Sequence, residues 1–313
     1  MTADAVAPQA HPAPSLAGRA APEIGIGLCV YNGEPYLSGS LASILAQDGD
    51  FDLVIADNCS TDATEEICRE AARKDPRVRY IRRDRNLGVI ANHNQIVHET
   101  RGEFFSFASS DDEYREDRLT LLAAALRAVP DASIAFSGAE EIDADGELIK
   151  LWRNTAPTDH PDPVRRLHSK LVHYDETLQF YGLMRRSLLE RALPLQPIVA
   201  CDRVLIAQMA LLGPMVAVDD PLLRHRNHAK SVSRANHARA FRKREKPEEN
   251  SRFFLPNVAE GAALARAIRH TPLSPGDRLR AYAALSPWLR RNAVPMARNV
   301  AHVAVGLVRG RAE

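Results

Sequence analysis

Short apolar runs alternate with longer segments of helical periodicity through the first half of the chain. Residues 24–30 read IGIGLCV and residues 51–56 read FDLVIA, which is typical of buried strands. Between them, Leu37, Leu41 and Ile44 recur at the spacing that places apolar side chains on one face of a helix. Strands separated by such helices predict βαβ units and a mostly parallel α/β sheet. We expect strands at 24–30, 51–56, 77–81, 103–108 and 132–137, and helices at 34–47, 61–74, 89–100 and 115–129.

The second half of the chain shows a more mixed pattern. Residues 143–146 read DADG and lie between Ile142 and Leu148, so they predict the turn of a β-hairpin. A charged break at 242–250 (RKREKPEEN) separates this half from a helical tail. The remaining elements are expected to be helices at 162–172, 186–192 and 202–212 and short strands at 215–218 and 222–225.

Composition places the chain among ordinary globular proteins, with 45% hydrophobic and 26% charged residues and a formal net charge of +1. Residues 1–22 are rich in Ala and Pro without an apolar segment, so we expect a disordered leader rather than a signal peptide. The four cysteines are scattered without a CxxC pair, which favours a reducing, cytoplasmic compartment over a disulfide framework or structural zinc site. No run of about 18 apolar residues predicts a transmembrane helix.

Two adjacent carboxylates, Asp111 and Asp112, follow the apolar run at 103–108. Charges at the end of a buried strand are costly unless they have a partner. Paired carboxylates suit a hard divalent cation such as Mg²⁺ or Mn²⁺, which binds oxygen ligands and bridges to phosphates. A solvated turn before a helix that favours acids at its start is the alternative.

Every predicted parallel strand ends in polar residues, and the carboxyl ends of such strands are where open α/β sheets bind ligands. The inventory of carboxylates, amides, a glycine turn and arginines suits a nucleoside diphosphate. No GxxxxGK[ST] motif is present, so a P-loop is excluded. Gly25 and Gly27 make only a weak dinucleotide fingerprint, because the third glycine is missing. The converging segments are 31–34 (YNGE), 57–62 (DNCSTD), 82–88 (RRDRNLG) and 109–112 (SSDD).

Several motifs in this order resemble the family-2 glycosyltransferases, which transfer sugars from nucleotide sugars. The resemblance covers about residues 24–233 and implies a GT-A fold, a Rossmann-like sheet flanked by helices. It implies a glycosyltransferase domain at 23–235, with a nucleotide-binding half at 23–115 and an acceptor half at 116–235, and a helical C-terminal extension at 236–313. The matching motifs are CVYNGEPYL (29–37), ADNCSTD (56–62), RNLGVIANHN (85–94), SSDDEYREDRL (109–119), FYGLMRRSLL (180–189), ACDRVLIAQMALLG (200–213) and LLRHRNHAKSVS (222–233).

The resemblance assigns the donor side of the site to residues of the first four motifs and the last. Asp57 is similar to the acid that hydrogen-bonds the nucleotide base, with Tyr31 and Glu34 on the same side. Asn86 and Gly88 belong to a loop that packs against the nucleotide. The full nucleotide-sugar-binding set that the resemblance implies is Tyr31, Asn32, Glu34, Asp57, Asn58, Asn86, Gly88, Asp111 and Arg226.

The resemblance also implies a metal and a base. Asp111 and Asp112 are similar to the working part of an Asp-X-Asp motif that contacts the ribose and a Mn²⁺ or Mg²⁺ ion, with His228 as a third ligand. Asp202 lies where inverting members of the family carry the general base. The cluster of Arg226, His228 and Ser231 resembles a late motif near the diphosphate.

The chain departs from the family pattern at two positions. Ser109 or Ser110 replaces the first acid of the Asp-X-Asp motif, which weakens the expected metal site and leaves metal independence open. The base motif is usually Glu-Asp, whereas Cys201 precedes Asp202 here.

An inverting glycosyltransferase needs stabilisation of the leaving diphosphate and a base for the acceptor hydroxyl. The expected donor is a UDP-sugar, with dTDP and GDP as alternatives. The expected acceptor is a cell-envelope glycan, a lipid-linked sugar or a secondary metabolite. A sugar nucleotidyltransferase and a non-catalytic nucleotide-sugar-binding member remain the alternatives.

Other candidates have simpler structural interpretations. His93 on its helix suits packing better than catalysis, and Asp62 suits either a helix start or a ligand contact. Trp152 suits a core or rim position as well as stacking on a sugar. The arginines at 82, 83 and 85 suit a solvated cluster as well as phosphate contact.

The tail is basic, with nine Arg against Asp277 and Glu313 from residue 264 onward. A packed helical subdomain with a solvated Arg face is the default interpretation. Peripheral contact with an anionic membrane is the second, with Trp288, Leu289 and Val300 among the apolar residues beside the arginines. Nucleic acid is not expected as a partner, because aromatic residues are sparse among the arginines.

Overall fold

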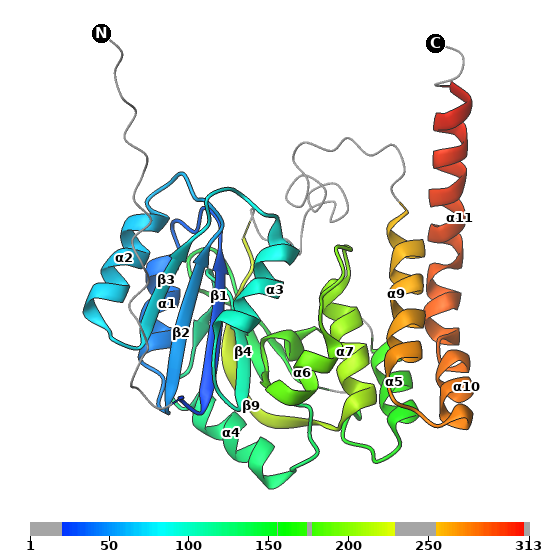
Figure 1. Cartoon of the computed structure of the whole chain (residues 1–313), viewed down its shortest axis with the longest axis horizontal. Coiled ribbons are helices and arrows are strands. Elements are labelled where there is room, and N and C mark those ends of the chain that lie inside the picture. The colour runs from blue at the N-terminus through cyan, green and yellow to red at the C-terminus, as the bar shows by residue number, and fades with distance from the viewer. Residues whose placement is uncertain (1–20, 155, 174–176, 229–254, 310–313) are drawn as a thin grey trace.

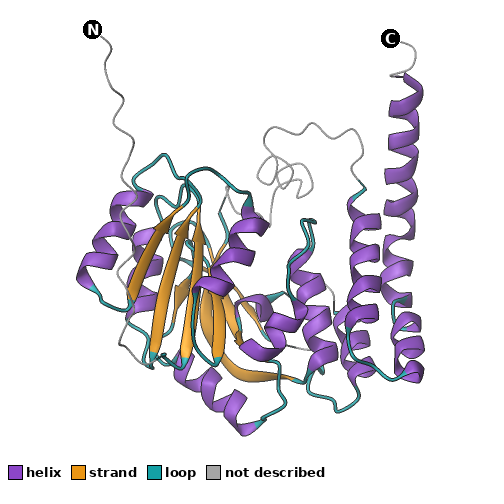
Figure 2. Cartoon of the chain, viewed as in Figure 1, coloured by secondary structure: helices purple, strands orange, loops and turns teal. Residues whose placement is uncertain are grey.

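A mixed β-sheet between two layers of helices forms the body of the protein in the computed structural model (Figure 1). The structure describes residues 21–154, 156–173, 177–228 and 255–309. Most of the predicted leader, the charged break at 242–250 and Ser231 lie outside these residues. Figure 2 shows the sheet with helices on both of its faces and a separate group of helices beyond its far edge.

The first four large strands are parallel, as the alternation of apolar runs and helices predicts. They are β1 (Ile24–Val30), β2 (Phe51–Asp57), β3 (Val78–Arg82) and β4 (Phe104–Ala108), and their order in the sheet is β3-β2-β1-β4. The connections are α1 (Leu37–Leu45), α2 (Thr64–Lys74) and α3 (Val89–Glu99). Because the strands run in register, with Val30 opposite Asp57, their carboxyl ends meet at one edge of the sheet.

Beyond β4 the sheet becomes mixed rather than parallel. The order continues through β8 (Leu183–Arg185), β6 (Ile134–Ile142), β9 (Met215–Arg226) and β5 (Glu113–Tyr114). β8 is antiparallel to both β4 and β6, and β9 is parallel to β6. The predicted hairpin is confirmed, since β7 (Leu148–Trp152) pairs antiparallel with β6 across residues 143–146.

Two local differences from the predicted strands have a clear cause. The two short strands expected at 215–218 and 222–225 are one strand, β9, whose register with β6 shifts near Gly138. Strands β5 and β8 were not predicted, because runs of two and three residues carry no readable period.

Each face of the sheet buries its own apolar cluster. On one face, α1 and α4 (Arg118–Ala128) pack with side chains such as Leu41 and Leu122. On the other, α3, α6 (Arg186–Ala192) and α7 (Cys201–Leu212) pack with Ile96, Leu189 and Met209. This three-layer arrangement fixes the edge of the sheet where the loops of the candidate site lie.

Gly27 in β1 serves close packing rather than phosphate binding. A Cβ atom at this position would lie 3.0 Å from the Phe105 ring and 3.1 Å from Ile96. These distances are tighter than ordinary contacts, so glycine lets β4 and α3 approach β1. Gly27 therefore has a packing role and does not belong to a dinucleotide-binding motif.

The C-terminal tail is helical, as predicted, and it packs on the second half of the domain. Helices α9 (Pro256–His270), α10 (Pro275–Ala283) and α11 (Ser286–Arg309) follow one another. Leu264 and Trp288 share an apolar cluster with Leu167 of α5 (Pro163–Val172) and Leu211 of α7. Among the described residues, none of the helices has the length and apolar character needed to cross a bilayer.

Candidate active site

The loops after β1 and β2 are joined by hydrogen bonds from backbone to side chain. The Asn32 amide N–H donates to Ser60 Oγ at 2.9 Å, and the Thr61 N–H donates to Asn32 Oδ1 at 2.9 Å. The Gly33 N–H donates to Thr64 Oγ1 at 2.8 Å. Asn32 adopts a positive φ of 53°, a conformation that Asn tolerates better than most residues. These contacts give the predicted nucleotide loops one defined shape.

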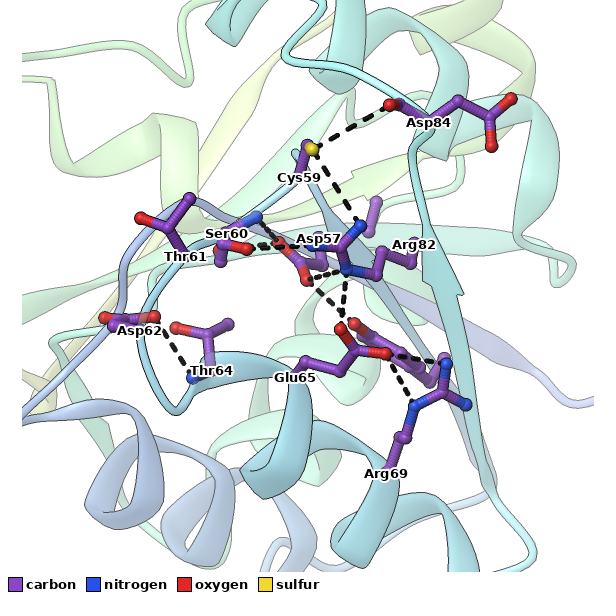
Figure 3. A network of polar contacts seen from close by, with 12 residues as sticks. Asp57, Cys59, Ser60, Thr61, Asp62, Thr64, Glu65, Arg69, Arg82 and Asp84 are labelled. Atoms are coloured by element: carbon purple, nitrogen blue, oxygen red, sulfur yellow. Dashed lines mark hydrogen bonds and ion pairs between the residues drawn. The ribbon is translucent and has the colours of Figure 1, made fainter. Parts of the chain in front are cut away.

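Asp57, the predicted partner of the nucleotide base, is 0% exposed and organises the loop after β2. Its Oδ1 accepts hydrogen bonds from the Ser60 N–H at 2.8 Å and the Ser60 hydroxyl at 2.6 Å. Its Oδ2 accepts from the Tyr80 hydroxyl at 2.7 Å and lies 3.7 Å from Arg82 Nε (Figure 3). Both oxygens are therefore engaged by the chain itself.

Asn58 links the loop after β2 to the loop after β3. Its Nδ2 donates to Asn86 Oδ1 at 2.8 Å, and its Oδ1 accepts from the Leu87 N–H at 2.8 Å. Asn86 Oδ1 also accepts from the N–H of Gly88, which begins α3 with a φ of 86°. The predicted residues Asn58, Asn86 and Gly88 are thus brought together in one contact network.

Tyr31 and Glu34 present side chains to solvent above this network. Tyr31 is 48% exposed, and Glu34 is exposed while its Oε2 lies 3.5 Å from the Ala63 N–H. Asp62 accepts hydrogen bonds from the Thr64 and Glu34 N–H groups, in keeping with a helix-start acid.

Two of the three arginines after β3 are held by acids of the chain. Arg82 Nε lies 2.8 Å from Glu65 Oε2, and its Nη2 donates to the Ser60 carbonyl (Figure 3). Arg83 is buried and makes a bidentate pair with Glu99 at 2.6 and 2.7 Å. These contacts fix the loop after β3 and leave the two guanidinium groups engaged within the fold.

The short strand β5 brings the acids after β4 to the end of β9. Glu113 pairs with Arg224 and Tyr114 pairs with Leu223. Asp112 is 0% exposed, and its Oδ1 accepts from the Arg226 N–H at 2.9 Å. His225 Nδ1 lies 3.1 Å from the same oxygen. Residues more than a hundred positions apart therefore share one buried carboxylate.

The contact between Asp112 and His225 changes the protonation of both groups. Burial raises the pKa of Asp112, and the hydrogen bond with His225 opposes that rise. Burial alone would lower the pKa of His225, but the hydrogen bond and charge of Asp112 raise it above its ordinary value. Both oxygens of Asp112 lie within 3.2 Å of His225 Nδ1, so this carboxylate faces the fold.

Asp111 turns to the other side and meets His228. Asp111 Oδ2 lies 2.9 Å from His228 Nε2, and Asp111 Oδ1 accepts from the Ser109 hydroxyl. The Asp111 side chain is 28% exposed and that of His228 is 10% exposed. Among the described residues, no three His, Cys, Asp or Glu side chains form a group that could hold a metal. Asp111 and His228 are the two predicted metal ligands whose side chains meet, whereas the Asp112 oxygens are engaged by His225 and the Arg226 N–H.

Arg226 supports the loop that carries these acids. It is 7% exposed, and its Nε donates to the Asp111 carbonyl at 3.1 Å. Its Nη1 donates to the carbonyls of Asp143 and Ala144, and its Nη2 pairs with Glu113. Arg226 is therefore placed beside the predicted diphosphate site while its donors bind the protein.

Asp202 begins the acceptor side at the first turn of α7, where its Oδ1 accepts from the Arg203 N–H at 2.8 Å. Burial raises the pKa of Tyr181 well above its ordinary value, and the charges of Asp112, Asp111 and Asp202 act in the same direction. The Tyr181 hydroxyl therefore experiences the charges of both the predicted base and the predicted metal ligands.

Three residues of this site were not predicted from the sequence: Tyr36, Tyr181 and His225. The Tyr36 ring lies 4.7 Å from the His228 ring and carries the Arg226 guanidinium at 4.9 Å. The Tyr181 and His225 rings are 6.4 Å apart. All three fall inside the matching motifs, but only spatial proximity singles them out.

His93 and Trp152 have the packing and rim positions that the sequence predicts for them. His93 packs against the rings of Phe107 and Phe180, and burial lowers its pKa. Trp152 donates from Nε1 to Glu141 Oε2 at 2.7 Å and stacks under Lys150 at the rim of the sheet.

Parts of this chain are similar in sequence to known proteins. The model of glycosyl transferase family 2 matches residues 26–193, which is more than half of the 313 residues. The succinoglycan biosynthesis protein ExoO of Rhizobium meliloti (strain 1021) is 33% identical over 132 residues, 42% of this chain and 37% of its own. The uncharacterized glycosyltransferase MJ1057 of Methanocaldococcus jannaschii is 33% identical over 135 residues, 42% of this chain and 47% of its own. The matches thus span less than half the length of these relatives.

A solved structure shares the fold over most of the chain. The crystal structure of S. aureus TarS residues 1–349 in complex with UDP-GlcNAc superposes with a TM-score of 0.55 and 19% identity, covering 86% of this chain and 81% of that TarS fragment. The predicted GT-A arrangement is therefore confirmed. Because the family model covers both the nucleotide loops and the acids after β4, the chain belongs to glycosyl transferase family 2.

Proposed function

We propose that this protein is an inverting glycosyltransferase that moves a sugar from a nucleoside diphosphate sugar to a hydroxyl acceptor. The observation that carries the proposal is the contact between Asp111 and His228, which are 117 positions apart and meet at the carboxyl edge of the sheet. That edge is where open α/β sheets bind nucleotides. Family membership supports sugar transfer over nucleotidyl transfer.

The donor nucleotide would bind over the loops after β1, β2 and β3. Exposed Tyr31 and Glu34 would contact the base and ribose, while Asp57, Asn58 and Asn86 hold the loops in shape. Asp57 is 0% exposed, so a base contact by Asp57 itself would require the loop after β2 to open. The buried residues Asp57, Asn58 and Asn86 would therefore position the exposed residues that contact the nucleotide.

A divalent cation, Mn²⁺ or Mg²⁺, would be held by Asp111 and His228 together with oxygens of the diphosphate. Bound there, it would supply positive charge to the leaving diphosphate. Ser109 contributes a hydroxyl to Asp111 where the family pattern has an acid, which lowers the negative charge offered to the ion. We therefore expect a metal bound mainly in the presence of the donor.

Asp202 would accept the proton of the acceptor hydroxyl as that oxygen attacks the sugar. Its carboxylate lies in the first turn of α7, at the end of the helix where the dipole favours negative charge. Attack from the side opposite the leaving group predicts inversion at the anomeric carbon. A helix-start acid without catalytic function is the alternative that the experiment below tests.

The relatives favour particular substrates. TarS is described in complexes with UDP-GlcNAc and with UDP, which makes a UDP-sugar the first donor to test, ahead of dTDP- and GDP-sugars. ExoO is named for succinoglycan biosynthesis, which supports a cell-envelope glycan or a lipid-linked sugar as acceptor.

The experiment combines donor binding with turnover. A panel of UDP-, dTDP- and GDP-sugars, each with Mn²⁺, Mg²⁺ or EDTA, should give a thermal shift with one nucleotide class, since saturation at about 100 Kd stabilises by ~2.7 kcal/mol. Asp202→Asn should keep this shift but lose at least about a hundredfold in transfer rate. Asp219→Asn, at an exposed acid of β9, is the matched control.

Three results would change the proposal. A near-normal transfer rate in Asp202→Asn removes Asp202 as the base. Donor binding with no turnover of any donor favours a non-catalytic nucleotide-sugar-binding protein. A thermal shift that survives EDTA keeps the transferase and removes the metal.

A further inference from the structure

Helix α11 carries a face that no other described element covers. Trp288 and Asn292 are buried against the other helices, and Met296 packs partly against the same cluster. The opposite side of the helix is exposed where side-chain exposure is described, from residue 289 to 301. The exposed side chains there are Leu289, Arg290, Ala293, Val294, Ala297, Arg298, Val300 and Ala301, and we call this set the α11 face.

The α11 face combines apolar and basic residues and lacks acids. Val294 is 59% exposed, Val300 is 52% exposed and Leu289 is 47% exposed, and they alternate with Arg290 and Arg298. No Asp or Glu occurs anywhere in residues 286–309. Single exposed apolar side chains are common, but several of them along one helix face beside arginines form a surface that suits a partner with both apolar and anionic groups.

The position of the helix relative to the site adds a second argument. Figure 1 shows α11 running past the start of α9 and ending on the same side of the molecule as the loops that follow β1 and β2. The sequence of its last residues, 300–309, reads VAHVAVGLVR. The basic and apolar helix therefore extends toward the side on which the candidate site opens.

We propose that the α11 face binds the surface of a bilayer that contains anionic lipids. Leu289, Val294 and Val300 enter the headgroup boundary, and Arg290 and Arg298 contact lipid phosphates. A second copy of the chain suits this face poorly, because a twofold contact would place arginines against arginines without an acid between them. Contact through this face would hold the site near a membrane-bound acceptor.

Vesicle flotation of the full chain tests the proposal. The protein should float with vesicles made of equal amounts of phosphatidylglycerol and phosphatidylcholine, should not float with phosphatidylcholine alone, and should dissociate as salt rises. The double variants Val294→Asp/Val300→Asp and Arg290→Glu/Arg298→Glu should each lower vesicle affinity by about tenfold or more. Leu148→Asp is the matched control, because Leu148 is 56% exposed on β7.

The outcomes separate this proposal from its rivals and from the proposed function. Equal flotation of all variants, or no flotation with anionic vesicles, overturns it. A dimer in sedimentation velocity that Val294→Asp/Val300→Asp dissociates would assign the face to a second copy and overturn it as well. Melting temperatures of the variants confirm that they are folded. Flotation requires no sugar transfer, so it can fail or succeed whatever the activity of Asp202.

Discussion

At the scale of single residues, burial separates two neighbours that look alike in the sequence. Asp112 has no exposed surface and hydrogen-bonds with His225 and with the Arg226 N–H. Asp111 is partly exposed and contacts His228. The two adjacent carboxylates therefore lie in different environments. The prediction that both acids bind a metal stays a prediction, and the structure shows only that Asp112 is engaged inside the fold.

Alanine variants distinguish these two roles. Asp112→Ala leaves the buried Arg226 N–H without an acceptor and should cost about 1–3 kcal/mol in the free energy of unfolding. Asp111→Ala should cost less stability but should abolish the part of donor affinity that depends on Mn²⁺. Urea unfolding and donor titration with and without EDTA measure the two effects. Equal stability loss in both variants would contradict the assignment.

Glu260 of α9 is a buried acid outside the candidate site. It is 6% exposed, its Oε1 has no hydrogen-bond partner, and burial raises its pKa to about 7 while a hydrogen bond with Trp288 opposes the rise. A raised pKa in the folded state means that stability is lost as pH rises from about 4.5 through 7. The full loss amounts to about 3 kcal/mol above that range.

Glu260→Gln should remove most of this dependence on pH. The variant's free energy of unfolding should differ little between pH 5 and pH 8, while that of the parent protein should fall by up to about 3 kcal/mol over the same interval. Glu190→Gln, at an exposed acid of α6, is the control and should follow the parent. Parallel curves for parent and Glu260→Gln would show that Glu260 does not titrate there.

At the scale of elements, the loops after β2 and β3 act as one unit because Asn58 and Asn86 hydrogen-bond each other. Asn58 is 3% exposed, so its amide cannot exchange these bonds for water without opening the loop. The loop after β1, which carries Tyr31 and Glu34, hydrogen-bonds in turn to the loop after β2 through Asn32.

A double-mutant cycle measures this coupling. Asn58→Ala should cost about 2 kcal/mol, since the Leu87 N–H loses its acceptor and Asn86 Oδ1 keeps only one of its two donors, the Gly88 N–H. The cost of Asn58→Ala and Asn86→Ala together should fall short of the sum by about 1 kcal/mol. Urea unfolding of the two single variants and the double variant gives these values. Strict additivity would mean that the two loops move independently.

At the scale of the whole molecule, the C-terminal helices share a core with the transferase domain. Trp288 of α11 is 1% exposed, touches Gly261 of α9 and joins the cluster formed with α5 and α7. The domain boundary at residue 236 was inferred from a change in the sequence pattern, and it stays a prediction. The shared core indicates that the extension and the acceptor half unfold together.

Trp288→Ala tests this shared core. The substitution should cost about 3–5 kcal/mol and should shift one cooperative transition of the whole chain to lower temperature. Leu289→Ala, at the exposed neighbour, should cost no more than about 0.5 kcal/mol. Differential scanning calorimetry would reveal a second, unshifted transition if the extension unfolded alone.

The sequence by itself determined the parallel half of the fold and its ligand edge. The runs at 24–30 and 51–56 and the helix at 34–47 carry a strong local period, and the motifs around Asp57, Asn86 and Asp111 mark the strand ends. Local hydrophobic spacing is set by neighbours in the chain, so it can be read without knowing the fold.

Only the tertiary structure decided which neighbours each polar residue contacts. The pairing of β5 with β9 joins Asp112 to His225 across 113 residues and Asp111 to His228 across 117. It also made β9 one strand, placed β8 antiparallel between β4 and β6, and buried Asp57 beneath its own loop. These outcomes depend on strand pairing and burial between distant segments, whose energies local sequence does not encode.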